Sequence, residues 1–416
     1  MSKKFIEVHV LQWFPFSCIN RDDAGLPKSM TLGGERRARW SSQSQKRALR
    51  LAMTKNMDAE NLATRTRRLP IQTLETLIGR GRDSAESAAR VVAAFWALGL
   101  NLNTVQEAKK DAKDTGEALA AQEGIEGAPA FGAVLTGRTQ VILPAPKAGA
   151  AYLADAIEKH WDVLGGVVNL ALVKDGKAEK KVAAAVVKET SSDLRRGIDA
   201  ARQADVALFG RMLTEVPDGG TVEAAASVAH AFTTHPDDYT TEFWSAVDDD
   251  AAAQGHGGSA NMGTQGYTSG AFYRYGVLDV DTLAEGPLNG EDDLVQAAAG
   301  AFVEQFASLL PTAMVHGTAP FVAPAYVVAR VSDAQRMLGD AFIRPVEPEE
   351  GDYLSASATR MATVASRSYA AYGNDGDAAY VLAAHPDVQG IEFPGATEVD
   401  TLTDLVDHVK EAAFRV

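Results

Sequence analysis

The sequence predicts an α+β fold in which strands from distant parts of the chain share one sheet. Residues 5–12 (FIEVHVLQ) place apolar side chains at alternate positions, which indicates a half-buried strand. Helical patterns dominate residues 70–205, and strand patterns return at 221–234 and 267–280. Because strands precede this helical stretch and resume after it, we expect it to be an insertion into a sheet domain.

Positive charge is concentrated near the N-terminus of an acidic chain. The 416 residues carry a formal net charge of −15, yet residues 20–68 hold 12 Lys and Arg against 5 Asp and Glu. The densest part, residues 36–50, reads RRARWSSQSQKRALR. Such a local basic segment is typical of a surface that binds a polyanion, but a solvated helix face has the same composition.

A short strand at 36–40 is expected to lead into a helix. Ser42 and Gln45 match a capping box, in which a serine and a glutamine three residues later satisfy free backbone amides. At about 100° per residue, one stripe of this helix is polar and basic, formed by Gln43, Lys46, Arg47 and Arg50. The helix N-terminus also attracts anions. The pattern alone leaves both a phosphate-binding surface and a solvated face open.

The rest of the chain gives a coarser prediction. Residues 174–193 carry many lysines and few large apolar residues, so we expect a solvated loop there. Aromatic residues within HPDDYTTEFWSAVDDD indicate a protruding hairpin, in which Phe243 and Trp244 either pack in the core or stack on bases. Helices are expected at 83–98, 104–122, 152–173 with a break at Gly165-Gly166, 291–310 and 400–414, and a further strand at 321–331.

Motifs for catalysis, metal or cofactor binding are not recognisable. His230 and His235 lack a metal-ligand context and are expected to be satisfied or exposed, and Asp22-Asp23 to cap a turn. The glycine-rich segments lack the GK[ST] ending of a nucleotide-binding loop. We therefore expect no enzyme and no cofactor. The single Cys18 suits a reducing cytoplasm, and no apolar run reaches the roughly 18 residues of a membrane span.

Several long blocks carry a family resemblance. The N-terminal signature FIEVHVLQ…INRDD…GGERRARWSSQSQKRALR is followed in order by DVALFGRM, SVAHAFTTH, FWSAVDDD and MGTQGYTSGAFYRYG. Together these blocks resemble the CasC family, the crRNA-binding backbone subunit of the type I-E CRISPR Cascade surveillance complex. The resemblance extends from residue 5 to about residue 280.

The resemblance implies a right-hand architecture. An RRM-like (ferredoxin-like) palm would comprise residues 1–70, 206–232 and 263–416, a helical fingers insertion residues 71–205, and a β-hairpin thumb residues 233–262. Copies of such a subunit polymerise along one crRNA in the cytoplasm. Each palm holds the RNA backbone, and a neighbour's thumb kinks the strand at regular intervals.

The implied partners are the crRNA, target DNA in the R-loop, other copies of the chain, other Cascade subunits and a recruited nuclease-helicase, with no membrane. Sequence would be read by pairing between guide and target, in antiviral defence. The residues that match the family's RNA contacts are Arg21, Lys28, Ser41, Ser42, Gln43, Ser44, Lys46, Arg47 and Arg50 in the palm, Met212 as a wedge, and Phe243, Trp244 and Ser245 in the thumb.

Two alternatives remain at this stage. The first is an RNA-cleaving relative, since backbone subunits of type III complexes resemble this family and use a loop aspartate, for which Asp22 or Asp23 is the candidate. The second is a purely structural polymerising module, which would contain no nucleic acid when purified.

Overall fold

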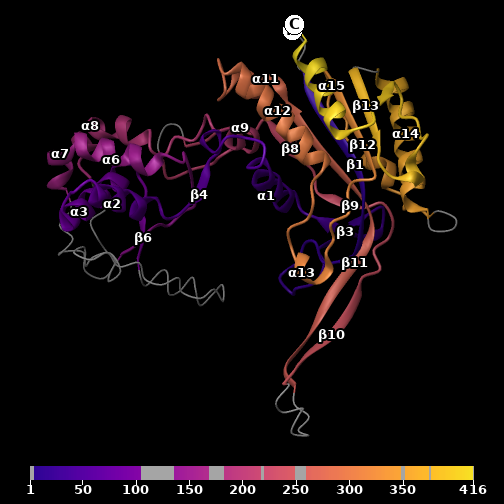
Figure 1. Cartoon of the computed structure of the whole chain (residues 1–416), viewed down its shortest axis with the longest axis horizontal. Coiled ribbons are helices and arrows are strands. Elements are labelled where there is room, and N and C mark those ends of the chain that lie inside the picture. The colour runs from indigo at the N-terminus through magenta and orange to yellow at the C-terminus, as the bar shows by residue number, and fades with distance from the viewer. Residues whose placement is uncertain are drawn as a thin grey trace. The chain divides into compact units, whose positions relative to one another are not determined.

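The chain divides into two compact units (Figure 1). The computed structural model describes residues 4–104, 135–167, 182–216, 220–248, 259–347, 352–373 and 376–415. The first unit comprises Met1–Met57 and Ala225–Val416, and the second comprises Asp58–Ala224. The helix expected at 104–122 lies outside the described residues except for Thr104, as do residues 168–181 of the helix and loop expected there.

The first unit is built on a ten-stranded sheet to which both ends of the chain contribute. Its strands are β1 (Phe5–Ser17), β2 (Ser29–Leu32), β3 (Glu35–Trp40), β8 (Ala226–Val228), β9 (Ala231–Thr233), β10 (Thr240–Val247), β11 (Ser259–Asp279), β12 (Tyr326–Ser332), β13 (Gly376–Ala383) and β14 (Ala396–Glu398). The order is β14-β13-β12-β1-β11-β9-β3-β2, and β8 and β10 also pair with β11. The expected sharing of one sheet by distant strands is confirmed.

Strand β1 lies in the middle of this sheet and is buried on both faces, which corrects the expected half-buried strand. It pairs antiparallel with β11 on one side and with β12 on the other. Its polar residues Glu7 and His9 are fully buried beside Phe5 and Leu11. Because Glu7 and His9 are held by internal hydrogen bonds, the alternation of polar and apolar residues does not mark a solvent face here.

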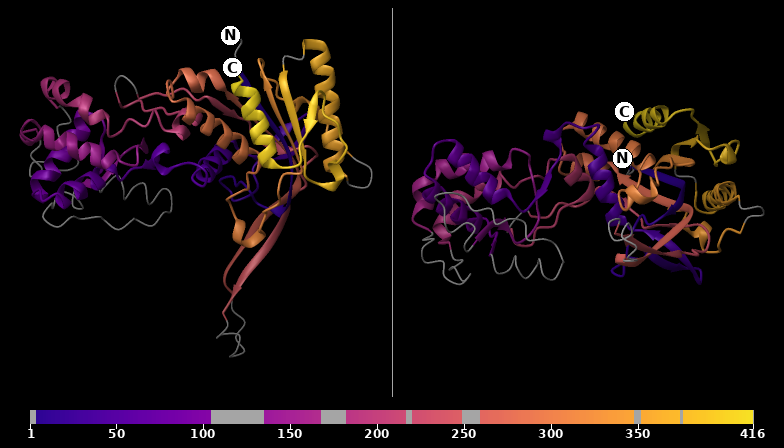
Figure 2. Two further views of the ribbon diagram at one scale, coloured as in Figure 1. Left: turned by 45° about the horizontal axis from the view of Figure 1, so that its top comes forward. Right: turned by 60° about the horizontal axis from the view of Figure 1, so that its bottom comes forward.

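Helices cover both faces of the sheet. Figures 1 and 2 show α12 (Asp292–Ala307) and α15 (Leu402–Phe414) on one face and α14 (Tyr353–Tyr372) on the other. Helix α14 packs its buried residues against those of β1, β11 and β12. Neither α14 nor β13 was predicted from the sequence. The remaining helical segments of this unit are α1 (Ser42–Met53), α11 (Val280–Glu285), α13 (Val315–Thr318), η3 (Gly339–Phe342) and η5 (Pro386–Val388).

The predicted hairpin is present as the pair β10 and β11. The register runs from Thr240 opposite Tyr267 to Val247 opposite Ser259. Strand β11 continues from this hairpin into the centre of the sheet, where it pairs with β1. One 21-residue strand therefore serves both the hairpin and the core.

The second unit is mainly helical and has its own core. Its elements within the described residues are η1 (Ala59–Asn61), β4 (Thr64–Thr66), α2 (Leu69–Gly79), α3 (Ser84–Ala97), β5 (Leu102–Thr104), β6 (Leu135–Thr139), β7 (Leu143–Ala145), α6 (Gly149–Lys159), α7 (Trp161–Gly165), α8 (Ala184–Arg195) and α9 (Ala204–Phe209). One expectation was wrong, because helix α8 occupies residues 184–193 of the segment expected to be a loop. The helix expected at 152–173 has an additional break at His160, and α7 ends at Gly165, where the expected break lies.

The second unit is larger than the insertion expected at 71–205. Strand β4 pairs with β7, and the amide of Ala63 donates to the Asp205 carboxylate at 2.7 Å. Arg211 pairs through its backbone with Val222. These contacts hold residues 58–70 and 206–224 within the helical unit, because their partners lie there and not on the ten-stranded sheet.

The molecule is therefore an α+β protein, as the sequence predicted. None of the helices in the described ranges combines the length and the apolar character that a membrane span requires.

Candidate nucleic-acid interface

The first turn of α1 is capped one residue earlier than predicted. Ser41, and not Ser42, is the N-cap residue, and its hydroxyl accepts a hydrogen bond from the amide of Ser44 at 3.3 Å. The amide of Ser41 in turn donates to the side chain of Asn20 at 2.9 Å. Ser41 is buried. Its hydroxyl satisfies one of the free backbone amides at the N-terminus of helix α1.

Gln45, the expected second member of the capping box, faces the interior. Its amide nitrogen donates to the carbonyl oxygens of Trp40 and Ala229, at 3.2 and 3.0 Å. Its side-chain oxygen accepts from the guanidinium of Arg274 at 3.4 Å. Gln45 therefore ties the helix to the sheet and does not close a capping box, because the N-cap one residue earlier places it beyond the first turn.

The four residues of the predicted polar stripe of α1 differ in their exposure to solvent. Gln43 and Arg47 are exposed, whereas Lys46 and Arg50 are half-buried. Partial burial lowers the pKa of Lys46. Ala48 and Leu49 on the opposite side are buried. The helix thus presents a basic surface and buries an apolar one, as its periodicity predicted.

The loop before β2 places further predicted contacts in the same unit. Arg21 is exposed and pairs through its backbone with Pro27, while Lys28 is half-buried. The carboxylate of Asp22 accepts hydrogen bonds from the amides of Ala24 and Leu26, at 3.0 and 2.9 Å. Asp22 therefore caps a turn, as expected.

Ser42 and Ser44 are half-buried and already engaged. The amide of Ser42 donates to Nδ1 of His230 at 3.2 Å, and the hydroxyl of Ser44 accepts from the indole of Trp40 at 3.0 Å. Both serines therefore help to hold the start of α1 in place.

The predicted aromatic residues of the hairpin are exposed. Phe243 is 68% exposed and Trp244 is 50% exposed, and Ser245 beside them is also exposed. Core packing, the alternative left open by the sequence, is therefore wrong. Phe243 and Trp244 are neighbours on one strand, so they point to opposite faces of the ribbon.

Sequence reasoning missed Met262, which belongs to the same hairpin. It lies opposite Ser245 and is 62% exposed. Directly paired residues share a face, so Met262 lies on the face of Phe243 and Ser245. The strand register supplies this placement, and the sequence alone carried no signal for it.

Met212 belongs to the second unit and is 75% exposed. Its neighbour Arg211 is buried and donates to the carbonyl oxygens of Gly220 and Ile198, at 3.2 and 3.0 Å. Arg211 fixes the backbone beside an exposed thioether, an arrangement suited to an apolar contact. The other twelve predicted contacts lie in the first unit.

Candidate metal ligands are not clustered in the described part of the chain. No cluster of three or more His, Cys, Asp or Glu side chains suited to a metal ion occurs there. His235 is buried and accepts from the amide of Ala271 at 3.2 Å, and His230 accepts from Ser42. The prediction that these histidines are satisfied or exposed is confirmed.

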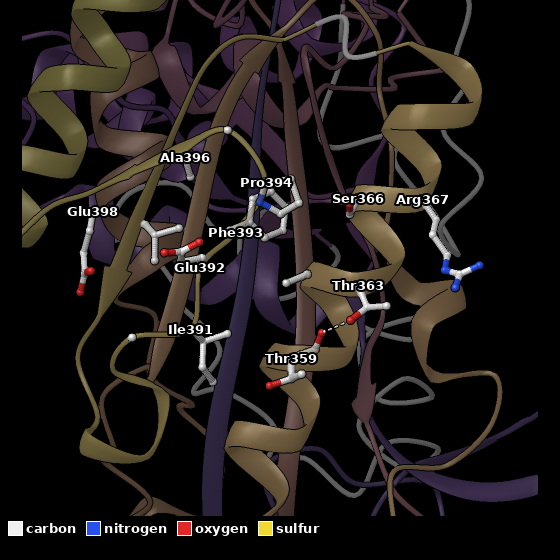
Figure 3. A pocket seen from close by; sticks show the side chains of 14 residues that line it. Thr359, Thr363, Ser366, Arg367, Ile391, Glu392, Phe393, Pro394, Ala396 and Glu398 are labelled. Atoms are coloured by element: carbon white, nitrogen blue, oxygen red, sulfur yellow. Dashed lines mark hydrogen bonds between the residues drawn. The ribbon is translucent and has the colours of Figure 1, made fainter.

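A cavity of about 1020 Å³ lies elsewhere in the first unit, between α14 and the segment from Gly390 to Glu398 (Figure 3). Within its wall, the hydroxyl of Thr363 donates to the carbonyl oxygen of Thr359 at 2.8 Å. Both signs of charge line it, through Arg367, Glu392 and Glu398. None of the predicted contact residues lines this cavity.

Solved structures show a chain of the same size and fold. One match, a chain of a structure entitled "CRISPR RNA-guided surveillance complex, pre-nicking", has a TM-score of 0.77 and 26% identity, and covers 99% of this chain and 100% of the other. A second, from a structure entitled "CRISPR RNA-guided surveillance complex", has a TM-score of 0.67 and 23% identity, with 98% and 99% covered, and shows the fold alone.

Comparison by sequence gives the family. No curated protein matches the chain. The family model described as "CT1975-like protein" matches residues 6–408, which includes almost all of both units. The chain is therefore a member of the CT1975-like protein family.

Proposed function

We propose that this protein is the crRNA-binding backbone subunit of a type I-E Cascade surveillance complex. The observation that carries the proposal is the similarity over 99% of the chain to a chain of a CRISPR RNA-guided surveillance complex. The N-terminal signature and the motif order support type I-E in particular.

In this proposal the first unit is an RRM-like palm with β10 and the start of β11 as its thumb, and the second unit is the fingers. The exposed residues Gln43 and Arg47, with Lys46 beside them, hold RNA phosphates by charge-assisted hydrogen bonds. Phe243 and Trp244 of a neighbouring copy stack at a kink in the RNA. The crRNA then pairs with target DNA, and a recruited nuclease-helicase cleaves that DNA.

The protein itself is proposed to have no catalytic activity. Asp22, a candidate for metal-dependent cleavage, has one carboxylate oxygen bonded to two backbone amides of its own turn. This engagement supports a structural role for Asp22. Incubating the assembled complex with Mg²⁺ and labelled target RNA tests the absence of catalytic activity, and periodic cleavage that is lost in Asp22→Ala or Asp23→Ala would overturn it.

RNA retention tests the main proposal. The protein purified with its complex should show an absorbance ratio at 260 and 280 nm typical of a ribonucleoprotein. The double variant Lys46→Glu, Arg47→Glu should lose the RNA while keeping its thermal midpoint, because neither side chain is fully buried. Affinity should fall with salt, with a slope of about −0.7 per neutralised phosphate. Salt-insensitive binding, or purification free of nucleic acid, would contradict the proposal.

A further inference from the structure

Arg39 and His230 meet at the start of α1, although they lie 191 residues apart in the chain. Arg39 is near the end of β3, and His230 directly precedes β9. Strands β3 and β9 pair with Trp40 opposite Ala231, which brings the two side chains together. Nδ1 of His230 lies 3.2 Å from Nη1 of Arg39 and 3.2 Å from the amide nitrogen of Ser42.

These contacts define the state of the His230 ring. Arg39 and the Ser42 amide are both donors, so Nδ1 must accept and the neutral ring carries its hydrogen on Nε2. Burial, followed by the charges of Arg39 and Lys28, lowers the pKa of His230. Within the described residues, Nε2 has no hydrogen-bond partner. The ring therefore keeps one free donor next to a cation.

The three arginines of β3 have different partners. Arg36 lies 3.6 Å from the carboxylate of Asp237, and its guanidinium stacks on Tyr239. Arg37 is fully buried and donates to the carbonyl oxygens of Thr233 and Phe342. Arg39 is half-buried, and no acidic side chain of the described ranges forms an ion pair with it.

Among the described residues, the Arg39 guanidinium therefore has neither a carboxylate partner, as Arg36 has, nor carbonyl acceptors, as Arg37 has. Its Nε is buried and finds no hydrogen-bond partner among the described residues. A partly buried guanidinium costs free energy unless an anion compensates it. Among the described residues its side-chain partner is a neutral histidine, so the guanidinium is available to pair with an external anion.

We propose that Arg39 and His230 form a phosphate contact for the bound RNA, in addition to the contacts that the family resemblance implies. In this proposal Arg39 pairs with a phosphate oxygen. His230 positions the guanidinium of Arg39 through Nδ1 and donates its own Nε2 hydrogen to the same phosphate. The N-terminus of α1 adds the positive end of a helix dipole at this point. This inference rests on the proposed RNA-binding function.

Binding of labelled single-stranded RNA to the full-length protein tests the Arg39 contact. Arg39→Gln should lower the affinity about tenfold to a hundredfold, the usual range for a charged hydrogen bond. It should also reduce the slope of log affinity against log salt by about 0.7. Arg36→Gln is the matched control on the same strand and should change the affinity less than twofold, because Asp237 already pairs with Arg36.

A titration separates the positioning role of His230 from a structural one. The ring is followed by NMR against pH, with and without the RNA, and its pKa should rise on binding because a phosphate stabilises the protonated ring. The charged groups that face this ring are Arg39 from β3 and Lys28 from the loop before β2. His230→Gln should weaken binding in parallel with Arg39→Gln, since it removes the group that holds the guanidinium.

The outcomes distinguish this inference from the proposed function. If the wild-type protein binds no RNA, the proposed function fails. If the wild type binds but Arg39→Gln and His230→Gln bind equally well, with an unchanged salt slope and an unchanged histidine titration, only this inference is overturned. Should Arg39→Gln fail to fold, Arg39→Lys keeps the charge and should retain the salt slope while losing affinity.

Discussion

The indole of Trp244 lies across Gly263 on the neighbouring strand of the hairpin. The two residues are directly paired, and a Cβ atom added to Gly263 would meet the indole ring at 3.0 Å. Glycine therefore leaves room for the ring to lie against the strand on one side. The other side of the ring is available to a base, since the residue is half exposed.

The first prediction concerns this pair. Trp244→Ala should weaken RNA binding by about 1–3 kcal/mol, the range for one base stacked on an aromatic ring. Gly263→Ala should weaken it by less, because the added methyl group displaces the indole without removing it. In the double variant the loss should equal that of Trp244→Ala alone, since both changes act through one ring. Equilibrium binding at one salt concentration measures all three.

Thr241→Ala on the same strand is the control, because Thr241 is exposed and carries no aromatic ring. Additive losses in the double variant would show that Gly263 acts independently of Trp244. Since both positions are on an exposed hairpin, the thermal midpoint should change little.

The second prediction concerns the two glycines at the turn between β2 and β3. Both have positive φ angles, 62° at Gly33 and 89° at Gly34. An added Cβ at Gly33 would overlap the carbonyl oxygen of Ile343, whereas at Gly34 it meets nothing within 4 Å. Gly34→Ala should therefore cost only the backbone strain, about 1–2 kcal/mol, and Gly33→Ala clearly more. Chemical denaturation of both variants checks the order, and equal losses would contradict it.

The third prediction concerns Glu7, a fully buried carboxylate in β1. It accepts hydrogen bonds from Tyr275 at 2.8 Å, from Arg330 at 3.1 Å and from Ser332 at 3.1 Å. Glu7→Gln leaves the buried guanidinium of Arg330 without its counter-charge and should destabilise the first unit by about 3–5 kcal/mol.

The double variant Glu7→Gln, Arg330→Met removes that uncompensated charge as well. It should be more stable than Glu7→Gln alone, as a double-mutant cycle in urea would show. A double variant that is less stable than Glu7→Gln would mean that Arg330 contributes mainly by packing on Tyr369, which its guanidinium also covers.

The fourth prediction concerns the pH dependence of stability. Burial, followed by the charge of Arg330, lowers the pKa of His9 from 6.5 to about 3. Between these values the unfolded chain binds one proton more than the folded one. The free energy of unfolding is therefore unaffected by His9 above about pH 6.5. Below that pH it falls by up to about 1.4 kcal/mol per pH unit.

Thermal midpoints from pH 7 to pH 4 measure this dependence. The wild type should lose stability more steeply than His9→Gln, while His316→Gln, at an exposed histidine, should follow the wild type. Parallel curves for the wild type and His9→Gln would show that His9 is protonated in the folded protein. In that case the hydrogen bond between His9 Nδ1 and the Tyr273 hydroxyl, 2.9 Å long, would have the imidazolium as its donor.

The sequence predictions were accurate where the signal lay within a few neighbouring residues, and less accurate where distant parts of the chain decide the structure. Helix α1 and the hairpin of β10 and β11 were predicted because period, turn residues and charge lie within a few residues of each other. The cap of α1 was misplaced by one residue, since Asn20 and His230 fix the start of the helix from other parts of the chain. Helix α8 was missed because its helical pattern follows a lysine-rich stretch.

By itself, the sequence determined the α+β class, the basic surface of α1 and the aromatic residues of the hairpin. The tertiary structure decided which arginines of RRAR are paired, buried or uncompensated, and that the polar residues of β1 are internal. These properties depend on contacts between residues that are distant in the chain, such as Arg39 with His230 and Glu7 with Arg330. Local periodicity shows on which side of its helix or strand a residue lies. Which charges and side chains pack against that side depends on the folding of distant segments onto it.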